Sequence, residues 1–357
     1  MGEPSEPFES DHEAFRDSVA AFLGGEIAPG WDEWIARGAV PDSAYARAAA
    51  QGIGSIAVPE EHGGAGVDDP RFDAVVAQEC ERLGLTGYGL VLAEHAEAAR
   101  WLARHGTDEL RARWLPGLAS GELRAAVAVA SGGPREGALE LVDVVGGATA
   151  SVAVVDGARD GSVLVLDLAA AGVTRHARST LGASGVDVAD VSVGDLSAAT
   201  VLVGSGAPEL RTQCRRAWSV LGAAGARTAL GMTVDYVNER RVFSTPVAAF
   251  GNTRTALAGL AAEVAGADAL VGQVLQAGDD TDTVRAAQAL LRATAAHDAA
   301  VDLGLQLHGG YGYMLEYPIS RAFADARYLR SHIGLDRVVD DLAPALGLVG
   351  AGAGVPA

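Results

Sequence analysis

Cysteine and positive charge are both scarce in this chain of 357 residues. Its two cysteines, Cys80 and Cys214, are too few for a disulfide framework and too far apart for a close-spaced zinc motif. Basic residues number 27 against 46 acidic ones, which gives a net charge of −19. Such a surface repels phosphate backbones and anionic lipids, so nucleic acid is an unsuitable partner.

The sequence also shows neither the pattern of a signal peptide nor a long apolar run. The first nine residues are polar and acidic, unlike a signal peptide. No apolar run reaches the ~18 residues needed to span a membrane without an interrupting charge, glycine or proline. Hydrophobic residues nevertheless make up 49% of the chain and charged residues 20%, a composition typical of folded domains. We expect a soluble, cytoplasmic protein without a membrane partner.

The predicted secondary structure changes twice along the sequence. Helical patterns dominate residues 1–122, short β-rich runs fill 123–206, and long helical stripes return at 207–349 before a flexible tail at 350–357. The β-rich runs are evenly spaced without helices between them, which favours an antiparallel barrel or sandwich over a dinucleotide-binding sheet. The predicted fold class is therefore α+β: a helical domain, a small antiparallel β domain and a four-helix bundle.

Individual elements follow from local patterns. Ser10 and Glu13 form a capping-box pattern that predicts a helix start. Apolar stripes predict long helices that end near Arg240 and that span 255–275 and 283–308. Strands are predicted at 125–130, 151–155, 163–166, 186–193 and 200–203.

Several spaced motifs then carry a resemblance to a known family. They are Val58–Gly64, His105–Thr107 with Arg113–Pro116, and the segments 236–250 and 306–327, in which Gln306–Tyr313 precedes Tyr317–Ile319 and Asp325–Arg327. With these motifs the chain resembles the acyl-CoA dehydrogenases over nearly its whole length. The resemblance implies a flavoprotein that binds FAD at a subunit interface and oxidises an acyl-CoA thioester. A base removes the α proton, a hydride leaves the β carbon, and an electron-transfer acceptor reoxidises the flavin.

The resemblance also implies cofactor residues on the bundle. Arg240 and Phe243 match an arg-x-x-phe-gly element whose arginine pairs with the FAD diphosphate, while Gln306, Gly309 and Gly310 match residues near the adenosine half. Simpler roles stay open, because Arg240 could complement a helix dipole and Gly309 could cap a helix. The family's glycine after Phe243 is Ser244 here, and its following glutamine is Gly251.

On the β domain the family pattern is largely lost. The loop that holds the flavin ring corresponds to Ala130–Gly137, which keeps little of the thr-glu-pro-x-x-gly-ser-asp motif. The strand that backs the ring falls near 147–154 and offers Thr149 and Ser151 but no aromatic residue. This β domain is therefore not expected to hold a flavin ring well.

The catalytic base is missing at both positions that the family uses. Ile333 replaces the usual glutamate, and Cys214 occupies the alternative position on the first bundle helix. Three relocated bases are conceivable: Cys214 with its pKa lowered by Arg215 and Arg216, His332, and Asp336. The simpler interpretations are a small buried hydrophobe for Cys214 and a solvated helix start for the other two. The histidines at 297, 308 and 332 lack metal-ligand spacing, so no metal is expected.

Three hypotheses follow. The first is a subunit of a heterotetrameric, FAD-dependent acyl-CoA dehydrogenase in fatty-acid or steroid side-chain metabolism. This subunit lacks its own catalytic base and completes the FAD site of a family partner. The second is a self-sufficient biosynthetic enzyme with a relocated base. The third is a flavin-free scaffold that kept only the fold.

Overall fold

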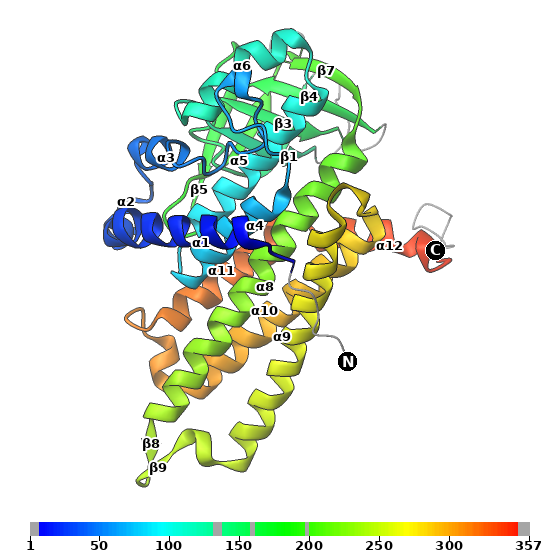
Figure 1. Ribbon diagram of the computed structural model, residues 1–357. Helices are drawn as coiled ribbons and strands as arrows, with labels where there is room; N and C mark the ends of the chain where they lie inside the picture. The colour runs from blue at the N-terminus through cyan, green and yellow to red at the C-terminus, as the bar shows by residue number, and fades with distance from the viewer. Residues whose placement is uncertain (1–6, 131–137, 158–160, 197–199, 349–357) are drawn as a thin grey trace.

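A computed structural model describes residues 7–130, 138–157, 161–196 and 200–348 of the protein. The predicted tail at 350–357 lies outside the described residues. Two helical regions flank a small β domain, and the long helix α8 (Ala207–Glu239) runs from that domain to the opposite end of the molecule (Figure 1). The predicted α+β architecture is confirmed.

The N-terminal region is helical. Its first helix is capped by Glu9 and not by Ser10 as predicted, because the backbone N–H of Glu9 donates to Nδ1 of His12 at 3.0 Å. The last helix of this region contains Pro116. The helices are α1 (Ser10–Phe22), α2 (Trp31–Arg37), α3 (Asp42–Ala49), α4 (Pro70–Arg82), α5 (Thr86–His105) and α6 (Asp108–Ser120).

The β domain is a sandwich of two sheets with the strand orders β1-β3-β4-β7 and β2-β6-β5. The strands are β1 (Ala125–Val129), β2 (Leu139–Val145), β3 (Val152–Asp156), β4 (Ser162–Asp167), β5 (Val173–Arg178), β6 (Val188–Val193) and β7 (Thr200–Ser205). Apolar side chains from both sheets share one core. The sequence did not predict β2 and β5.

One strand pairing corrects the expectation of a purely antiparallel domain. Strands β1 and β3 are parallel, whereas the other pairings within the two sheets are antiparallel. The chain leaves β1, crosses to the second sheet to form β2, and returns to enter β3 in the same direction. A parallel pair needs such a crossover, which local sequence does not reveal.

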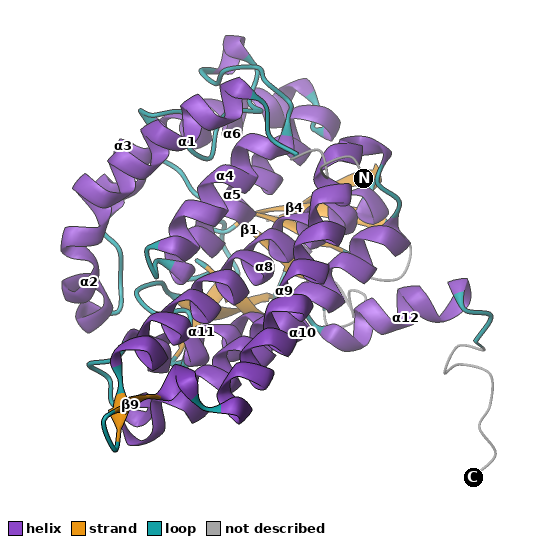
Figure 2. Ribbon diagram, turned by 60° about the horizontal axis from the view of Figure 1, so that its bottom comes forward, coloured by secondary structure: helices purple, strands orange, loops and turns teal. Residues whose placement is uncertain are grey.

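The C-terminal region consists of long helices that pack along one another (Figure 2). Alongside α8 they are α9 (Gly251–Ala277), α10 (Thr283–His308), α11 (Pro318–His332) and α12 (Leu335–Ala345), and a short hairpin of β8 (Arg241–Val242) and β9 (Thr245–Pro246) follows α8. The observed bounds of α10 equal the predicted ones. One described stretch, Gly251–Asp280, could cross a membrane by length and composition, but core helices of soluble proteins pass the same test.

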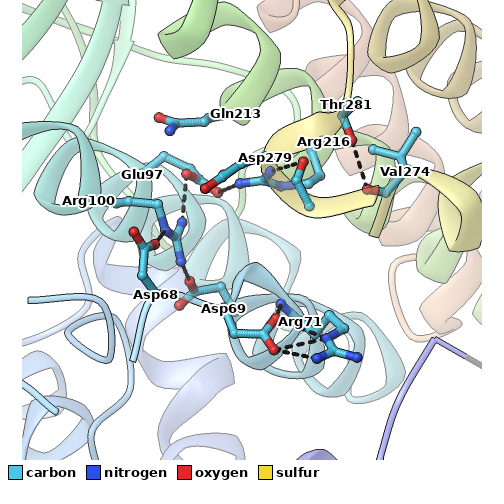
Figure 3. A network of polar contacts seen from close by, with 12 residues as sticks. Asp68, Asp69, Arg71, Glu97, Arg100, Gln213, Arg216, Val274, Asp279 and Thr281 are labelled. Carbon is cyan, nitrogen blue, oxygen red and sulfur yellow. Dashed lines mark hydrogen bonds and ion pairs between the residues drawn. The ribbon is translucent and has the colours of Figure 1, made fainter. Parts of the chain in front are cut away.

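Buried charges fasten α8 to the N-terminal helices (Figure 3). Arg100 on α5 is fully buried, and its Nη1 donates to Oε2 of Glu97 at 2.7 Å while its Nε donates to Oδ1 of Asp68 at 2.9 Å. Its Nη2 also pairs with Asp73 on α4. On α8, Nη2 of Arg216 lies 3.7 Å from Oε1 of Glu97. Glu97 therefore links two buried guanidinium groups from different helices.

Replacing Arg100 with methionine should strongly destabilise the protein. The change leaves Asp73 and Glu97 without their shared cation, and breaking a buried ionic cluster on one side costs about 3–5 kcal/mol of unfolding free energy. Urea unfolding followed by circular dichroism measures the loss. Arg37→Ala, which removes an exposed pair with Glu33, is the control and should cost less than about 1 kcal/mol. Equal, small losses in both variants would contradict this account of the cluster.

Candidate functional site

A cavity of 250 Å³ lies where the β domain meets α8 and the end of α11. We call it the interdomain cavity. Strands β1 and β2 supply one wall, the N-terminal part of α8 supplies another, and the turn between α11 and α12 closes it. Its lining residues are Val127, Ala128, Val129, Val142, Asp143, Asp156, Leu210, Arg211, Cys214, Arg215, Trp218, Ser331, His332, Ile333 and Gly334.

The structure brings Ile333 and Cys214 to this one cavity. Ile333 caps the C-terminus of α11 and Cys214 lies on α8, and both side chains are buried. Burial raises the pKa of the Cys214 thiol well above its ordinary value, with nearby carboxylates adding to the effect. The thiol is therefore neutral, so neither side chain can remove a proton near pH 7. This arrangement agrees with the interpretation of Cys214 as a small buried hydrophobe.

His332 is held as a cation beside Ile333. Its Nε2 lies 2.6 Å from Oε1 of Glu94, and its Nδ1 lies 3.6 Å from Oδ2 of Asp143. Burial alone would lower the pKa of His332, but the two carboxylates outweigh burial and raise the pKa to about 10. The indole of Trp218 also donates to Oε1 of Glu94, at 3.2 Å. A protonated imidazole cannot accept another proton, so His332 does not suit the role of a base.

The other charged residues that line the cavity also form ion pairs. Nε of Arg211 lies 3.0 Å from Oδ2 of Asp156, and Arg215 pairs with Asp341 on α12. Arg215 keeps one buried nitrogen, Nη1, without a hydrogen-bond partner among the described residues. The side chain of Asp336, the third conceivable base, lies outside the described residues.

The residues present do not fit a flavin ring in the interdomain cavity. The hydroxyl of Thr149 donates to Oδ1 of Asp187 at 2.8 Å and so is already engaged within the β domain. The strand that follows it, β3, carries no aromatic side chain. Of the loop Ala130–Gly137, residues 131–137 lie outside the described part of the chain. The described donors thus offer little to the polar edge of a flavin.

A second cavity, of 590 Å³, lies at the far end of the bundle, and we call it the bundle-end cavity. Arg240, Gly309 and Gly310 line it together with Tyr236 and Tyr311. The guanidinium of Arg240 lies 5.4 Å from the centre of the Tyr311 ring, is exposed, and has no ion pair with a described carboxylate. Gly309 also ends α10 with a φ of +60°, so its role as a helix cap is real.

A phosphate group fits this second cavity. An exposed guanidinium beside backbone glycines offers several donors and close approach to an anion. Two of the five predicted cofactor residues do not line it: Gln306 is exposed on α10, and Phe243 stands 96% exposed at the tip of the β8–β9 hairpin. Phe243 and Ser244 both have positive φ, which explains why glycine suits the position of Ser244.

Sequence reasoning missed Glu94, Asp143 and Trp218. A usable signal existed for the first, because Glu94, Glu97 and Arg100 recur at intervals of three within a helix that is otherwise largely apolar. Charges on a buried face need partners. The partner of Glu94 is 238 positions away, so the signal identifies a buried charge but not its contact. No metal-binding group of histidine, cysteine or carboxylate residues occurs in the described part of the chain.

Comparisons with known proteins agree with this architecture. Residues 9–122 match the family model of the acyl-CoA dehydrogenase N-terminal domain, and residues 212–339 match that of the C-terminal domain. Together these models cover more than half of the chain. The protein therefore belongs to the acyl-CoA dehydrogenase family, whose reaction is an FAD-dependent dehydrogenation.

Relatives extend the match over nearly the full length. The mitochondrial long-chain specific acyl-CoA dehydrogenase of Rattus norvegicus is 27% identical over 374 residues, which covers 94% of this chain and 86% of the relative. The acyl-CoA dehydrogenase of Geobacillus kaustophilus superposes with a TM-score of 0.83 at 25% identity, covering 96% and 99% of the two chains. A Bacillus anthracis acyl-CoA dehydrogenase complexed with FAD shares the fold, with a TM-score of 0.79, 23% identity, and coverage of 95% and 67%.

Replacing Glu94 with glutamine should lower the pKa of His332 by about 1–3 units, because the nearer of two anions is lost. Asp143→Asn should lower it less, since the separation is larger. Proton NMR titration of the ring, assigned with His332→Gln, measures both.

The same shift predicts the pH dependence of stability. The folded pKa of about 10 exceeds the ordinary value of 6.5. The contribution of His332 to stability is therefore complete below pH 6.5 and is lost as the pH rises toward 10.

If the pKa of His332 in Glu94→Gln equals that in the unchanged protein, the ion pair between His332 and Glu94 is not formed.

Proposed function

We propose that this chain is a subunit of an FAD-dependent acyl-CoA dehydrogenase that completes the cofactor site of a partner subunit and has no efficient turnover of its own. The main support is the pair of residues at the two usual positions of the base, Ile333 and Cys214, which line the same cavity. Ile333 has no group that accepts a proton, and the buried Cys214 thiol stays protonated near pH 7. Loss of a positioned base costs about 10²–10⁴ in rate.

The bundle-end cavity supports the second half of the proposal. Cys214 and Arg240 stand at opposite ends of α8, and their 26 positions correspond to roughly 39 Å along a helix. This separation exceeds the length of one extended dinucleotide, so a cofactor beside Arg240 is one whose flavin ring lies in another chain. Exposed apolar side chains cluster in the segments that border this cavity, as expected at a subunit contact. They are Val242, Phe243, Tyr311, Tyr313, Met314 and Leu315.

In the proposed complex the partner carries the base and would hold the flavin ring, and bound FAD would supply the hydride acceptor for the acyl-CoA thioester. Arg240 supplies charge-assisted hydrogen bonds to the diphosphate, and Gly309 and Gly310 admit the adenosine half. A heterotetramer with an electron-transfer acceptor, acting in the cytoplasm on fatty-acid or steroid side chains, is the proposed setting.

The alternative of a relocated base at Cys214 or His332 finds little support in the cavity, and the side chain of Asp336 lies outside the described residues. Burial raises the pKa of Cys214, and Glu94 with Asp143 raises that of His332, so both groups hold their protons at neutral pH. A flavin-free scaffold is likewise not favoured, because Arg240 still lines an exposed cavity suited to a phosphate.

The absorbance spectrum tests the proposal. The chain produced alone should be colourless or poor in flavin, and it should become yellow and active with acyl-CoA only when co-produced with a family member that carries the base glutamate. A flavin-saturated homo-oligomer that oxidises a thioester would contradict the proposal.

Arg240→Ala in the co-produced complex tests the contact itself. Loss of a charge-assisted hydrogen bond costs about 1.5–3 kcal/mol, so FAD affinity should fall about 10- to 100-fold. FAD titration of the apo complex, followed by flavin fluorescence, measures this change. Arg241→Ala is the matched control, because the neighbouring Arg241 bonds to Ser244 of its own hairpin and does not line the cavity. Equal affinities in both variants would remove Arg240 from the site.

A further inference from the structure

A third cavity, of 590 Å³, shares no lining residue with the interdomain cavity and only Glu316 with the bundle-end cavity, and we call it the Glu81 cavity. It is enclosed by α2, the turn between α4 and α5, the middle of α8, α10, and the start of α11. Its walls are mixed. Ile35, Leu83, Met232, Leu315, Pro318 and Ala322 are apolar, whereas Glu81, Thr86, His297 and Asp325 are polar and buried. Its volume falls in the range of about 300–1,000 Å³ typical of ligand pockets.

Glu81 is the unusual group in this cavity. The residue is 3% exposed, and its Oε2 accepts a hydrogen bond from the hydroxyl of Thr86 at 3.0 Å. Its other oxygen, Oε1, is buried without a hydrogen-bond partner among the described residues. A buried carboxyl oxygen without a partner costs free energy, so it indicates a contact that this chain alone does not supply.

A second carboxyl group faces the same space. Asp325 on α11 accepts hydrogen bonds from the backbone N–H and the hydroxyl of Ser184, at 3.1 and 3.2 Å. Burial, against the opposing hydrogen bond from Thr86 and with a contribution from the charge of Asp325, raises the pKa of Glu81 to about 8. Burial likewise raises the pKa of Asp325 to about 6. Glu81 and Asp325 are therefore two buried carboxyl groups that face the same cavity.

No described cation forms an ion pair with Glu81, although the charge of Arg321 opposes the rise in the pKa of Asp325. Arg82 pairs with Glu79 at 2.7 Å, and Arg321 pairs with Asp32 at 3.1 Å. Burial lowers the pKa of His297 to about 4, so its imidazole is neutral. That ring packs against Gly225, where a Cβ would come within 2.4 Å of it, so a glycine is required in this wall. With Glu316 also in the lining, acidic groups outnumber basic ones.

This chain has no side-chain ammonium to offer, because the printed sequence contains no lysine. A second copy cannot supply one either. We propose that the Glu81 cavity binds a small organic amine as its ammonium ion, with Oε1 of Glu81 accepting from the ammonium and the apolar wall covering the alkyl part. A strongly hydrated point charge with several donors suits a pair of carboxyl oxygens.

The proposal carries a defined pH dependence. Glu81 holds a proton below its pKa of about 8, and an ammonium favours the ionised carboxylate, so binding near pH 7 releases a proton. An alkylammonium itself stays charged to about pH 10. Affinity should therefore rise from pH 6 to pH 8 and level off above. The other titratable groups facing the cavity are Asp32, Arg82, His297, Glu316, Arg321 and Asp325.

Isothermal titration of the full chain with n-hexylammonium, in two buffers of different ionisation enthalpy, tests the proposal. Saturable binding with proton release at pH 7 is expected, and n-hexanol, the neutral analogue, should bind at least tenfold more weakly. This comparison needs no variant. Equal binding of amine and alcohol would overturn the proposal, and so would the absence of binding by methyl-, butyl- and hexylammonium.

The isosteric variant Glu81→Gln should weaken n-hexylammonium binding at least tenfold and abolish proton release. Glu33→Gln is the control, since Glu33 lies on α2 beside the cavity but pairs with Arg37, and neither residue lines the cavity. It should change the affinity less than twofold. Unchanged binding in Glu81→Gln would overturn the assignment, and all of these titrations use this chain by itself, without FAD or a partner subunit.

Discussion

Helix α8 is the element on which the arrangement of this protein depends. Its buried Arg216 shares Glu97 with Arg100 of α5, so charge pairing in a low-dielectric interior sets how α8 lies against the N-terminal helices. A buried pair of this kind specifies position more than it adds stability. Position matters here, because the same helix carries Cys214 to the interdomain cavity and ends in Arg240 at the bundle-end cavity.

The two cavities differ in what they can do. At the interdomain cavity, the carboxylates of Glu94 and Asp143 pair with the protonated His332. Ile333 and Cys214 provide no proton acceptor at the two positions that the family uses for the base. In the bundle-end cavity, Arg240 stays exposed beside glycine backbone. In the proposed function the chain has lost its own base but has kept groups that can hold phosphate. The Glu81 cavity is lined by buried carboxyl groups and apolar side chains, and the proposed FAD-dependent function does not use it.

Much of the fold was predictable because long helices repeat their apolar residues over many turns, and α10 was placed at its observed bounds. The strands were harder. In β2 an irregularity between Leu141 and Val144 breaks the alternation, and β5 is an edge strand with a mostly exposed face. At the site, resemblance located Ile333 and Cys214, but the contact of His332 with Glu94 spans two domains and has no local signature. Gln306 and Phe243 were assigned to the cofactor from their motifs, yet neither lines the bundle-end cavity.

In the proposed complex, this chain binds the diphosphate of an FAD molecule whose flavin ring lies in the partner subunit. The most direct measurement is the stoichiometry of FAD in the purified, active complex with a family partner, obtained from flavin absorbance and quantitative amino-acid analysis. The account predicts one FAD for every two chains. One FAD for every chain would contradict it.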